Sequence, residues 1–461
     1  MNWINCISAK RTGYTYSSSP GLRSDYQRDY DRLIFSTAFR RLQNKTQVFP
    51  LPGSSTFVHN RLTHSLEVAS VGRSLGSVVG HEIAADLANY DDAAQFYRND
   101  LQGVIGAACL AHDVGNPAFG HSGEKAISNF FIQNEKAEYY GKSLKAYFSE
   151  KEWADVINFE GNANALRVLT KHFAGKLSGG LALTFTTLAS ILKYPCESSA
   201  QSKSNVHTKK YGFFQSELQI FDDIVADTFM KEESSNPIAF KRHPYVYLVE
   251  AADDICYRIV DMEDAHRLKI LSTELVSSLF IEVLTELARP EIDIDKVKKT
   301  IRTLDDENER IAYLRAKLIS GLVNQSAEIF KFNKSAILEG SYTSTLMDDV
   351  EVQCQALKTI EQISIDRIYN HHSVIKVELA GYKVMYGLLE VFIPCVLSEE
   401  PKGIDKKSFS LIPSQFIVKG ENKSAYDRVM GVMDFVSGMT DDYAIEMYRN
   451  IMGIEIATHS V

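Results

Sequence analysis

Apolar residues recur at three- and four-residue spacing along most of the chain, which is the period of an amphipathic α-helix. On the stripe of one such segment lie His64, Val68, Val71 and Leu75. The pattern predicts a mainly α-helical protein. The clearest helices are expected at residues 29–43, 63–87, 101–113, 245–265, 382–393 and 426–439.

Patterns that would indicate β-strands are few and short. Residues 180–192 fit either a helix or a strand, and residues 408–418 could form part of one small hairpin. No alternation of strands and helices runs along the sequence, which argues against a parallel-sheet enzyme. The expected fold class is therefore mainly α, with at most a small β-hairpin.

The composition narrows the class of protein further. A chain of 461 residues with 45% hydrophobic residues can bury a large core, and its net charge of −9 gives no overall attraction to nucleic acid or to an anionic membrane. The six cysteines are scattered, so neither a disulfide framework nor a cysteine zinc site is expected. No apolar run approaches 18 residues, which predicts a cytoplasmic protein without membrane contact.

Titratable residues gather in the stretch CLAHDVGNPAFGHSGE, which begins at residue 109. His112 and Asp113 end an apolar helix, a Gly-Asn-Pro turn follows, and His121 and Glu124 come after it. Residues 115–122 mimic the phosphate-binding loop G-x-x-x-x-G-K-[ST]. A histidine replaces the lysine, however, and a helix rather than a strand precedes the turn, so we reject that interpretation.

Polar side chains also occupy two helix faces that the pattern makes apolar. Arg61 lies one turn before His64 on the same face, and an arginine there is hard to explain without an anion nearby. Asp253 is in register with the apolar residues of its helix, where a carboxylate needs a cation or a metal ion. Its neighbour Asp254 has the spacing of an exposed ion pair with Arg258.

Two imidazoles and two carboxylates suit a first-row divalent metal ion with open positions for water and substrate. Such a set is present in His64, His112, Asp113 and Asp253. The same helix carries Asp253, Tyr257 and Asp261 at four-residue spacing, a row that could line a pocket.

The polar, serine-rich segment 196–212 fits either a mobile surface loop or a loop that contacts a nucleotide. The second interpretation depends on His207, Lys209 and Lys210, whose side chains suit phosphates.

With these residues in view, the chain closely resembles the HD-domain superfamily, and within it the bacterial deoxyguanosine triphosphate triphosphohydrolases and related dNTPases. The resemblance is carried by the motif R-x-x-H-S from Arg61, by HDVGNPAFGHSGE and by EAADDICYRIVDMEDA. It extends to RSDYQRDYDRLIFSTAFRRLQNKTQVFPL, YNHHSVIKVELAGYKV and SGMTDDYAIEMY, and so to almost the whole chain. It implies a helical HD core with an N-terminal family segment in residues 1–270 and a helical C-terminal region, residues 271–461, packed on that core.

The resemblance also implies an activity, namely metal-dependent hydrolysis of deoxynucleoside triphosphates, dGTP or a broader set, to deoxynucleoside and tripolyphosphate. One divalent ion per subunit (manganese, magnesium, iron, cobalt or zinc) would bind His64, His112, Asp113 and Asp253. His121 and Glu124 match the catalytic histidine and its acidic partner. The implied substrate contacts are Gln47, Tyr257 and Asp261 for the deoxyribose, Arg61 for phosphate, and Asn116 and Glu160 near the site. Homo-oligomers, commonly hexamers, and nucleotide activators are expected from the family.

The chemistry agrees with these roles. Expulsion of the 5′-oxygen of the nucleoside needs a proton, and we interpret His121 as the acid that supplies it, with Glu124 one helical turn on. Plainer roles stay open: His121 could only orient a water or a phosphate oxygen, and Glu124 and Glu160 could be acids at helix N-termini. Alternative functions are a 5′-nucleotidase, a guanosine tetraphosphate hydrolase, or an HD protein that only binds nucleotides or single-stranded DNA.

Overall fold

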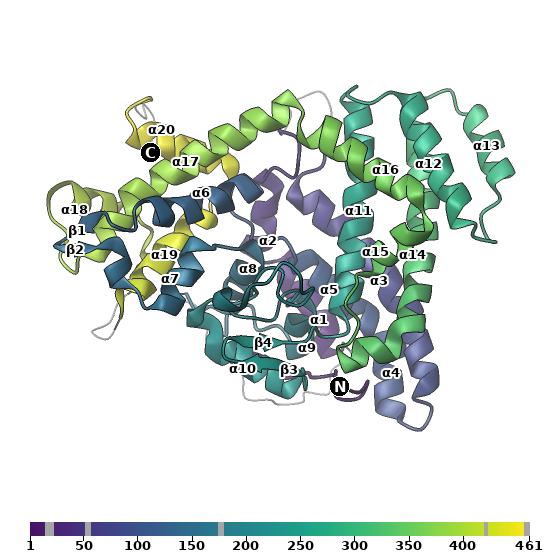
Figure 1. Cartoon of the computed structure of the whole chain (residues 1–461), viewed down its shortest axis with the longest axis horizontal. Coiled ribbons are helices and arrows are strands. Elements are labelled where there is room, and N and C mark those ends of the chain that lie inside the picture. Colours follow the sequence, from purple (N-terminus) through teal and green to yellow (C-terminus); the bar gives the residue numbers. More distant parts are fainter. Residues whose placement is uncertain (14–22, 51–56, 174–178, 419–422, 456–461) are drawn as a thin grey trace.

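The computed structural model describes residues 1–13, 23–50, 57–173, 179–418 and 423–455. Within these ranges the chain is mainly helical and its only strands are four short ones, which confirms the expected fold class (Figure 1). The helices of the first part are α1 (Asp25–Ile34), α2 (Thr37–Arg40), α3 (Arg61–Asp86), α4 (Asp91–Asn99), α5 (Leu101–Ala111), α6 (Gly120–Gln133), α7 (Glu150–Ile157), α8 (Gly161–Thr170), α9 (Phe185–Ile191), α10 (Leu218–Asp227) and α11 (Val246–Arg267).

Helix α3 packs closely on α4 and α5 because glycines recur at four-residue spacing on its inner face. A Cβ added at Gly72 would lie 2.4 Å from Cys109 Sγ, and one at Gly80 would lie 2.2 Å from the Tyr97 carbonyl oxygen. No larger side chain fits at these positions without a shift of the neighbouring helix. The close packing brings His64, in the first turn of α3, beside the C-terminal end of α5.

The predicted helix at 29–43 is wrong as a single element. α1 ends at Ile34, and Ser36 caps the separate helix α2, with its side chain accepting a hydrogen bond from the Phe39 N–H at 3.1 Å. A capping serine adopts an extended backbone, so the helix cannot run through it. A 3₁₀ turn, Arg41–Asn44, then leads toward the segment before α3.

The second part of the chain adds a further set of helices. α14 packs against α3, α11 and α12, while α17 packs against α6, α19 and α20 along one edge of the molecule (Figure 1). A second hydrophobic cluster joins side chains of α6 and α7 to those of α17, α19 and α20. These helices are α12 (Thr273–Leu287), α13 (Ile294–Arg302), α14 (Glu307–Glu339), α15 (Leu346–Gln353), α16 (Gln355–Ile363), α17 (His372–Leu397), α18 (Gly403–Ser410), α19 (Ala425–Ser437) and α20 (Asp441–Ile451).

The strands lie elsewhere than the sequence suggested. β1 (Glu138–Tyr139) pairs antiparallel with β2 (Lys142–Ser143), and β3 (Glu232–Ser235) pairs antiparallel with β4 (Ile238–Phe240). The hairpin expected within 408–418 is wrong, because the end of α18 and a 3₁₀ turn occupy its described residues. Residues 185–191 form helix α9, capped by Thr184, which resolves the ambiguity of that segment.

Helix α17 is the one described helix long and apolar enough to cross a membrane by length and composition. Its most apolar window is 56% buried inside the protein, as is common for a core helix. The helix is therefore weak evidence for a membrane span.

Candidate active site

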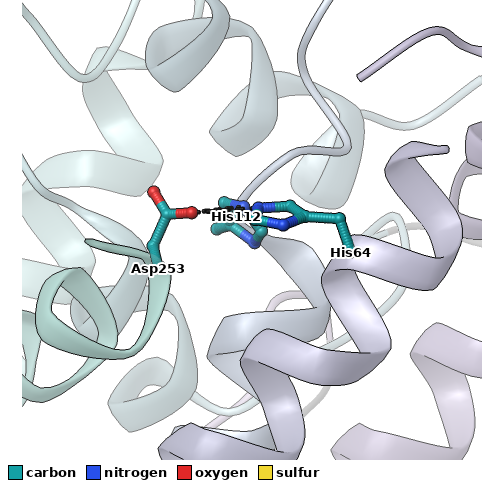
Figure 2. A group of neighbouring side chains, drawn as sticks. All are labelled: His64, His112 and Asp253. Atoms are coloured by element: carbon teal, nitrogen blue, oxygen red, sulfur yellow. Dashed lines mark hydrogen bonds and ion pairs between the residues drawn. The ribbon is translucent and has the colours of Figure 1, made fainter. Parts of the chain in front are cut away.

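Two histidines and one aspartate point at a common centre (Figure 2). His64 comes from α3, His112 follows the last turn of α5, and Asp253 lies in α11. The Asp253 Oδ1 atom lies 3.0 Å from His64 Nε2 and 3.5 Å from His112 Nε2. One ligand atom of each residue lies within 4.8 Å of the other two, so the three side chains could hold a metal ion.

The orientation and the charges of His112 and Asp253 favour a cation site at this centre. The Nδ1 atom of His112 lies 2.6 Å from the Cys109 carbonyl oxygen, so it is the protonated nitrogen and Nε2 is left to face the cluster. Burial lowers the pKa of His112, but Asp113 and Asp253 outweigh it and raise that pKa to about 9. Burial opposes ionisation of Asp253, yet His112 and His64 hold its pKa well below the usual range. Without an ion, the protonated His112 therefore pairs with the Asp253 carboxylate, and a metal ion at this centre would replace the proton on Nε2.

Asp113, the fourth expected ligand, lies at the edge of this cluster. Its Oδ1 is 3.6 Å from His112 Nε2, while its Oδ2 accepts a hydrogen bond from Arg61 Nη1 at 2.8 Å. Asn116 donates to Oδ1 of the same carboxylate. The buried Arg61 thus fixes the Asp113 carboxylate. The Nε of Arg61 is a buried donor without a partner among the described residues.

An open cleft of about 200 Å³ extends from the cluster. Most of the expected site residues line it. The lining also includes residues that the sequence analysis had not singled out, namely Asn162 of α8, Ser190 and Ile191 at the end of α9, Lys193 and Tyr194 after it, and Val246, Val249 and Glu250 of α11. Its full lining is His112, Asp113, Asn116, His121, Glu124, Glu160, Asn162, Ser190, Ile191, Lys193, Tyr194, Lys210, Val246, Val249, Glu250 and Asp253.

The turn after His112 returns the chain to this cleft. Phe119 adopts a left-handed backbone, with φ of 60°, and α6 begins at the next residue, so His121 faces the cleft from the first turn of α6. Glu124, one turn later, is buried and accepts a hydrogen bond from the Gly161 N–H at 2.8 Å. Among the described side chains, no hydrogen bond joins Glu124 to His121. The two residues share the cleft, while Glu124 also caps the start of α8.

Ion pairs surround His121. Lys210 Nζ lies 2.9 Å from Glu160 Oε1, and Lys193 Nζ lies 3.3 Å from Glu250 Oε1. Desolvation by the cleft and the positive charges of Lys210 and Arg61 lower the pKa of His121. Burial raises the pKa values of Glu124 and Glu160.

The segment 196–212 reaches the cleft through Lys210, as the nucleotide-contacting interpretation requires. Its other basic residues do not: Lys209 is exposed, and His207 is buried, where its Nδ1 accepts the Arg242 N–H at 3.3 Å. The segment is also anchored by a hydrogen bond from the Ser198 hydroxyl to Asp155 at 2.6 Å. Lys193 and Tyr194 could not be predicted as cleft residues, because they follow a segment whose secondary structure was ambiguous from its pattern.

The expected sugar-contacting residues lie outside the cleft lining described above, and two of them, Tyr257 and Asp261, share helix α11 with Asp253. Tyr257 and Asp261 continue the row of Asp253 along α11, and Tyr369 connects them. The Tyr369 hydroxyl donates to Asp261 Oδ2 at 2.8 Å, and its ring stacks on Tyr257 at 5.5 Å between centroids. Burial is the main reason that the pKa of Asp261 is raised to about 8. The Oε1 atom of Gln47 is buried and has no partner within the described structure.

Two family models match the chain. The HD domain matches residues 61–176, and the phosphohydrolase-associated domain matches residues 345–450. The first covers α3 to α8 and includes three of the four expected metal ligands. The second corresponds almost residue for residue to the segment from α15 to α20. Asp253 lies between the two matched regions.

Curated relatives resemble the chain over nearly its full length. A deoxyguanosinetriphosphate triphosphohydrolase-like protein of Synechocystis sp. is 36% identical, over 99% of this chain and 100% of its own length. A protein of the same description from Listeria monocytogenes is 34% identical, over 98% and 100%. A deoxyguanosinetriphosphate triphosphohydrolase of Yersinia enterocolitica is 30% identical, over 93% and 94%. Because these relatives are at least 30% identical over 93% or more of the chain, the chain belongs to the deoxyguanosinetriphosphate triphosphohydrolase-like family of HD-domain hydrolases.

Proposed function

We propose that the protein hydrolyses deoxynucleoside triphosphates, dGTP or a broader set, to deoxynucleoside and inorganic tripolyphosphate in a metal-dependent reaction. The observation that carries this proposal is the convergence of His64, His112 and Asp253 at one end of a cleft that also contains His121. The names of the relatives add the substrate class.

The charges of the cleft support a requirement for a cation. Its lining includes five carboxylates, whereas its lysines, Lys193 and Lys210, are already engaged with Glu250 and Glu160. A triphosphate is itself strongly anionic, so it needs further positive charge to enter. A divalent ion at His64, His112, Asp253 and the adjacent Asp113 would supply that charge, polarise a phosphate oxygen and lower the pKa of a water molecule.

The protein side chains then divide the remaining work. His121 is positioned in the cleft to protonate the departing 5′-oxygen of the nucleoside. Lys193, Lys210 and Tyr194 would contact the triphosphate, and Glu124 would keep the first turn of α6 in place through Gly161. Gln47, Tyr257 and Asp261 would contact the deoxyribose, which would give the buried Gln47 Oε1 a hydrogen-bond donor.

The reaction is tested by supplying each of the four dNTPs, singly and in pairs, with Mn²⁺ or Mg²⁺, and identifying the products. Nucleoside and tripolyphosphate in equal amounts are expected. Orthophosphate or pyrophosphate as the sole inorganic product would contradict the proposal and favour one of the other HD phosphohydrolase reactions. The paired incubations also test the expected nucleotide activation.

The metal site is tested with Asp253→Ala, which we expect to abolish turnover and to weaken Mn²⁺ binding in calorimetry. Asp254→Ala is the matched control: it removes the neighbouring carboxylate of the same helix, which lies 3.9 Å from Arg258. It should keep turnover within a few-fold of the unmodified protein. Unchanged turnover in Asp253→Ala would remove this residue from the site.

We also propose a cytoplasmic homo-oligomer for this hydrolase, on the resemblance alone. Size-exclusion chromatography with light scattering, with and without dNTPs, tests that assembly.

A further inference from the structure

A single carboxylate from the C-terminal region holds the backbone at two places beside the cleft. Asp441, the first residue of α20, is 5% exposed. Its Oδ1 accepts a hydrogen bond from the Phe119 N–H at 3.0 Å, and its Oδ2 accepts one from the Thr46 N–H at 2.8 Å. The partners are 322 and 395 residues away in sequence.

Both amides lie where the backbone carries proposed site residues. Phe119 is the left-handed residue that ends the turn, two residues before His121, and Thr46 immediately precedes Gln47. A non-glycine residue at positive φ is costly unless its surroundings fix it. A carboxylate that binds a buried N–H on each oxygen satisfies both donors and sets the separation of the two segments.

Neighbouring contacts from the same region reinforce this arrangement. The buried Lys45 donates to the Asn116 carbonyl oxygen at 2.6 Å and to that of Ser437, in α19, at 3.0 Å. Gly381 of α17 packs against Phe119 so closely that an added Cβ would lie 2.3 Å from the Phe119 ring. The turn is therefore held by α17, α19 and α20 together, and Asp441 joins it to the Gln47 segment through two backbone amides, beside the bridge that Lys45 makes.

We propose that Asp441 is a positioning residue of the active site, which fixes His121 and Gln47 relative to each other by binding the Phe119 and Thr46 amides. The inference rests on the proposed function for its kinetic readout. Displacement of a positioned group by about 1 Å can cost about 10²-fold in rate. Metal binding should depend less on this contact, because Asp441 bonds the Thr46 and Phe119 amides and makes no hydrogen bond to His64, His112, Asp113 or Asp253 in the described structure.

The test compares Asp441→Asn with Asp442→Asn. Asp442 is the exposed next residue in the same first helical turn, so both changes remove one negative charge from the start of α20. Only Asp441→Asn replaces an acceptor oxygen by an amide that cannot accept the N–H facing it. We expect its kcat to fall about 10- to 100-fold with Mn²⁺ affinity retained. We expect Asp442→Asn to stay within a few-fold of the unmodified protein.

Two readouts separate positioning from a general loss of stability. The preference for a dNTP over its 2′,3′-dideoxy analogue, which lacks the 3′-hydroxyl, should shrink in Asp441→Asn. The reason is that Gln47, a proposed contact of the deoxyribose, shifts when Thr46 is released. Hydrogen exchange should accelerate in peptides that contain Thr46 or Phe119, and not elsewhere in α3 or α5. Equal kcat losses in both variants, or a lower melting temperature with unchanged kcat and unchanged sugar preference, would overturn the proposal.

The exchange experiment also separates this inference from the proposed function. If the unmodified protein released no tripolyphosphate, the proposed reaction would fail, whereas unchanged exchange at Thr46 and Phe119 in Asp441→Asn would refute the positioning role by itself. Should Asp441→Asn not fold, Asp441→Ser is judged by the same criteria, because a hydroxyl can accept a hydrogen bond from one of the amides.

Discussion

The two regions that the family models match contribute to the cleft in different ways. Residues 61–176 supply reactive side chains, among them His112, His121 and Glu124. Residues 345–450 supply none of the described cleft-lining side chains, yet they contact the backbone of the turn at Phe119 and, through Lys45, at Asn116. The first region carries the side chains that can react, and contacts from the second region hold the backbone that positions them.

This difference teaches where substitutions should act. A change in the HD region that removes a reactive atom outside the proposed metal ligands should lower the rate and leave stability and metal binding nearly intact. A change in the associated region should act through packing, and it should lower the rate where the packing reaches the turn or, through Tyr369, the proposed sugar contacts Tyr257 and Asp261. Asp253, outside both regions, belongs functionally with the first, because α11 carries it to the two histidines.

Among changes that leave the proposed metal ligands in place, the largest effect is expected from His121→Ala. Loss of a positioned general acid typically costs about 10²- to 10⁴-fold in rate, so kcat should fall by that factor with Mn²⁺ affinity unchanged. Lys125→Ala, an exposed position on the same helix, is the control and should leave kcat within two-fold. A His121→Ala protein with normal kcat would leave the HD region without its proposed acid.

The pH profile sharpens the same assignment. An acid must be protonated, and the pKa of His121 is lowered by desolvation, Lys210 and Arg61, so kcat/KM should fall as pH rises through a value below that of an ordinary histidine. Bound triphosphate adds negative charge, which raises this pKa, so the fall in kcat should come at higher pH than the fall in kcat/KM. Lys210→Met should move the fall in kcat/KM to higher pH. If Lys210→Met did not shift the fall of kcat/KM with pH, His121 would not be the group whose titration causes that fall.

The next effect concerns the contact between the two regions. Arg167 of α8 is buried and binds Asp434 of α19 through Nε at 2.7 Å and Nη2 at 2.9 Å. Arg167→Ala should lower the free energy of unfolding by about 3–5 kcal/mol, because the buried Glu217 loses the cation it binds and Asp434 keeps only Lys171. Urea titration measures this.

The control for that change is Arg449→Ala, which removes the exposed ion pair with Glu455 and should cost about 1 kcal/mol or less. Similar losses in the two variants would mean that the buried pair contributes no more to joining the regions than a surface contact does.

The smallest effect should come from Gly381→Ala, and it discriminates best. Overpacking there should cost about 1–3 kcal/mol of stability and, because the added Cβ meets Phe119, should also lower kcat. Gly387→Ala is the matched control on the same helix, since its Cβ would meet Tyr448 at 2.5 Å, within the associated region. We expect the two variants to lose similar amounts of stability and only Gly381→Ala to have a lower kcat. Equal kcat values would mean that the packing of α17 on Phe119 does not affect catalysis.

Much of the helical fold could be predicted from local pattern. α3, α5, α11 and α19 begin and end within a few residues of their predicted bounds, because apolar periodicity and capping residues are local signals. The prediction failed at 29–43 and 408–418, where Ser36 starts a new helix and where helical turns replace an expected hairpin. Short elements give too few periods for the pattern to decide between helix and strand.

By itself, the sequence determined which residues are candidates for chemistry, since His64 and Asp253 are polar residues on apolar helix faces and His112 and His121 flank a turn. Only the tertiary structure decided how they are held. Three kinds of contact join residues far apart in the chain. Glycines of α3 pack on neighbouring helices, Lys193 and Lys210 line the cleft, and Asp441 binds the Thr46 and Phe119 amides. Such contacts leave no periodic trace, because a hydrogen bond to a backbone amide depends on where the amide lies in space and hardly on which side chain it carries.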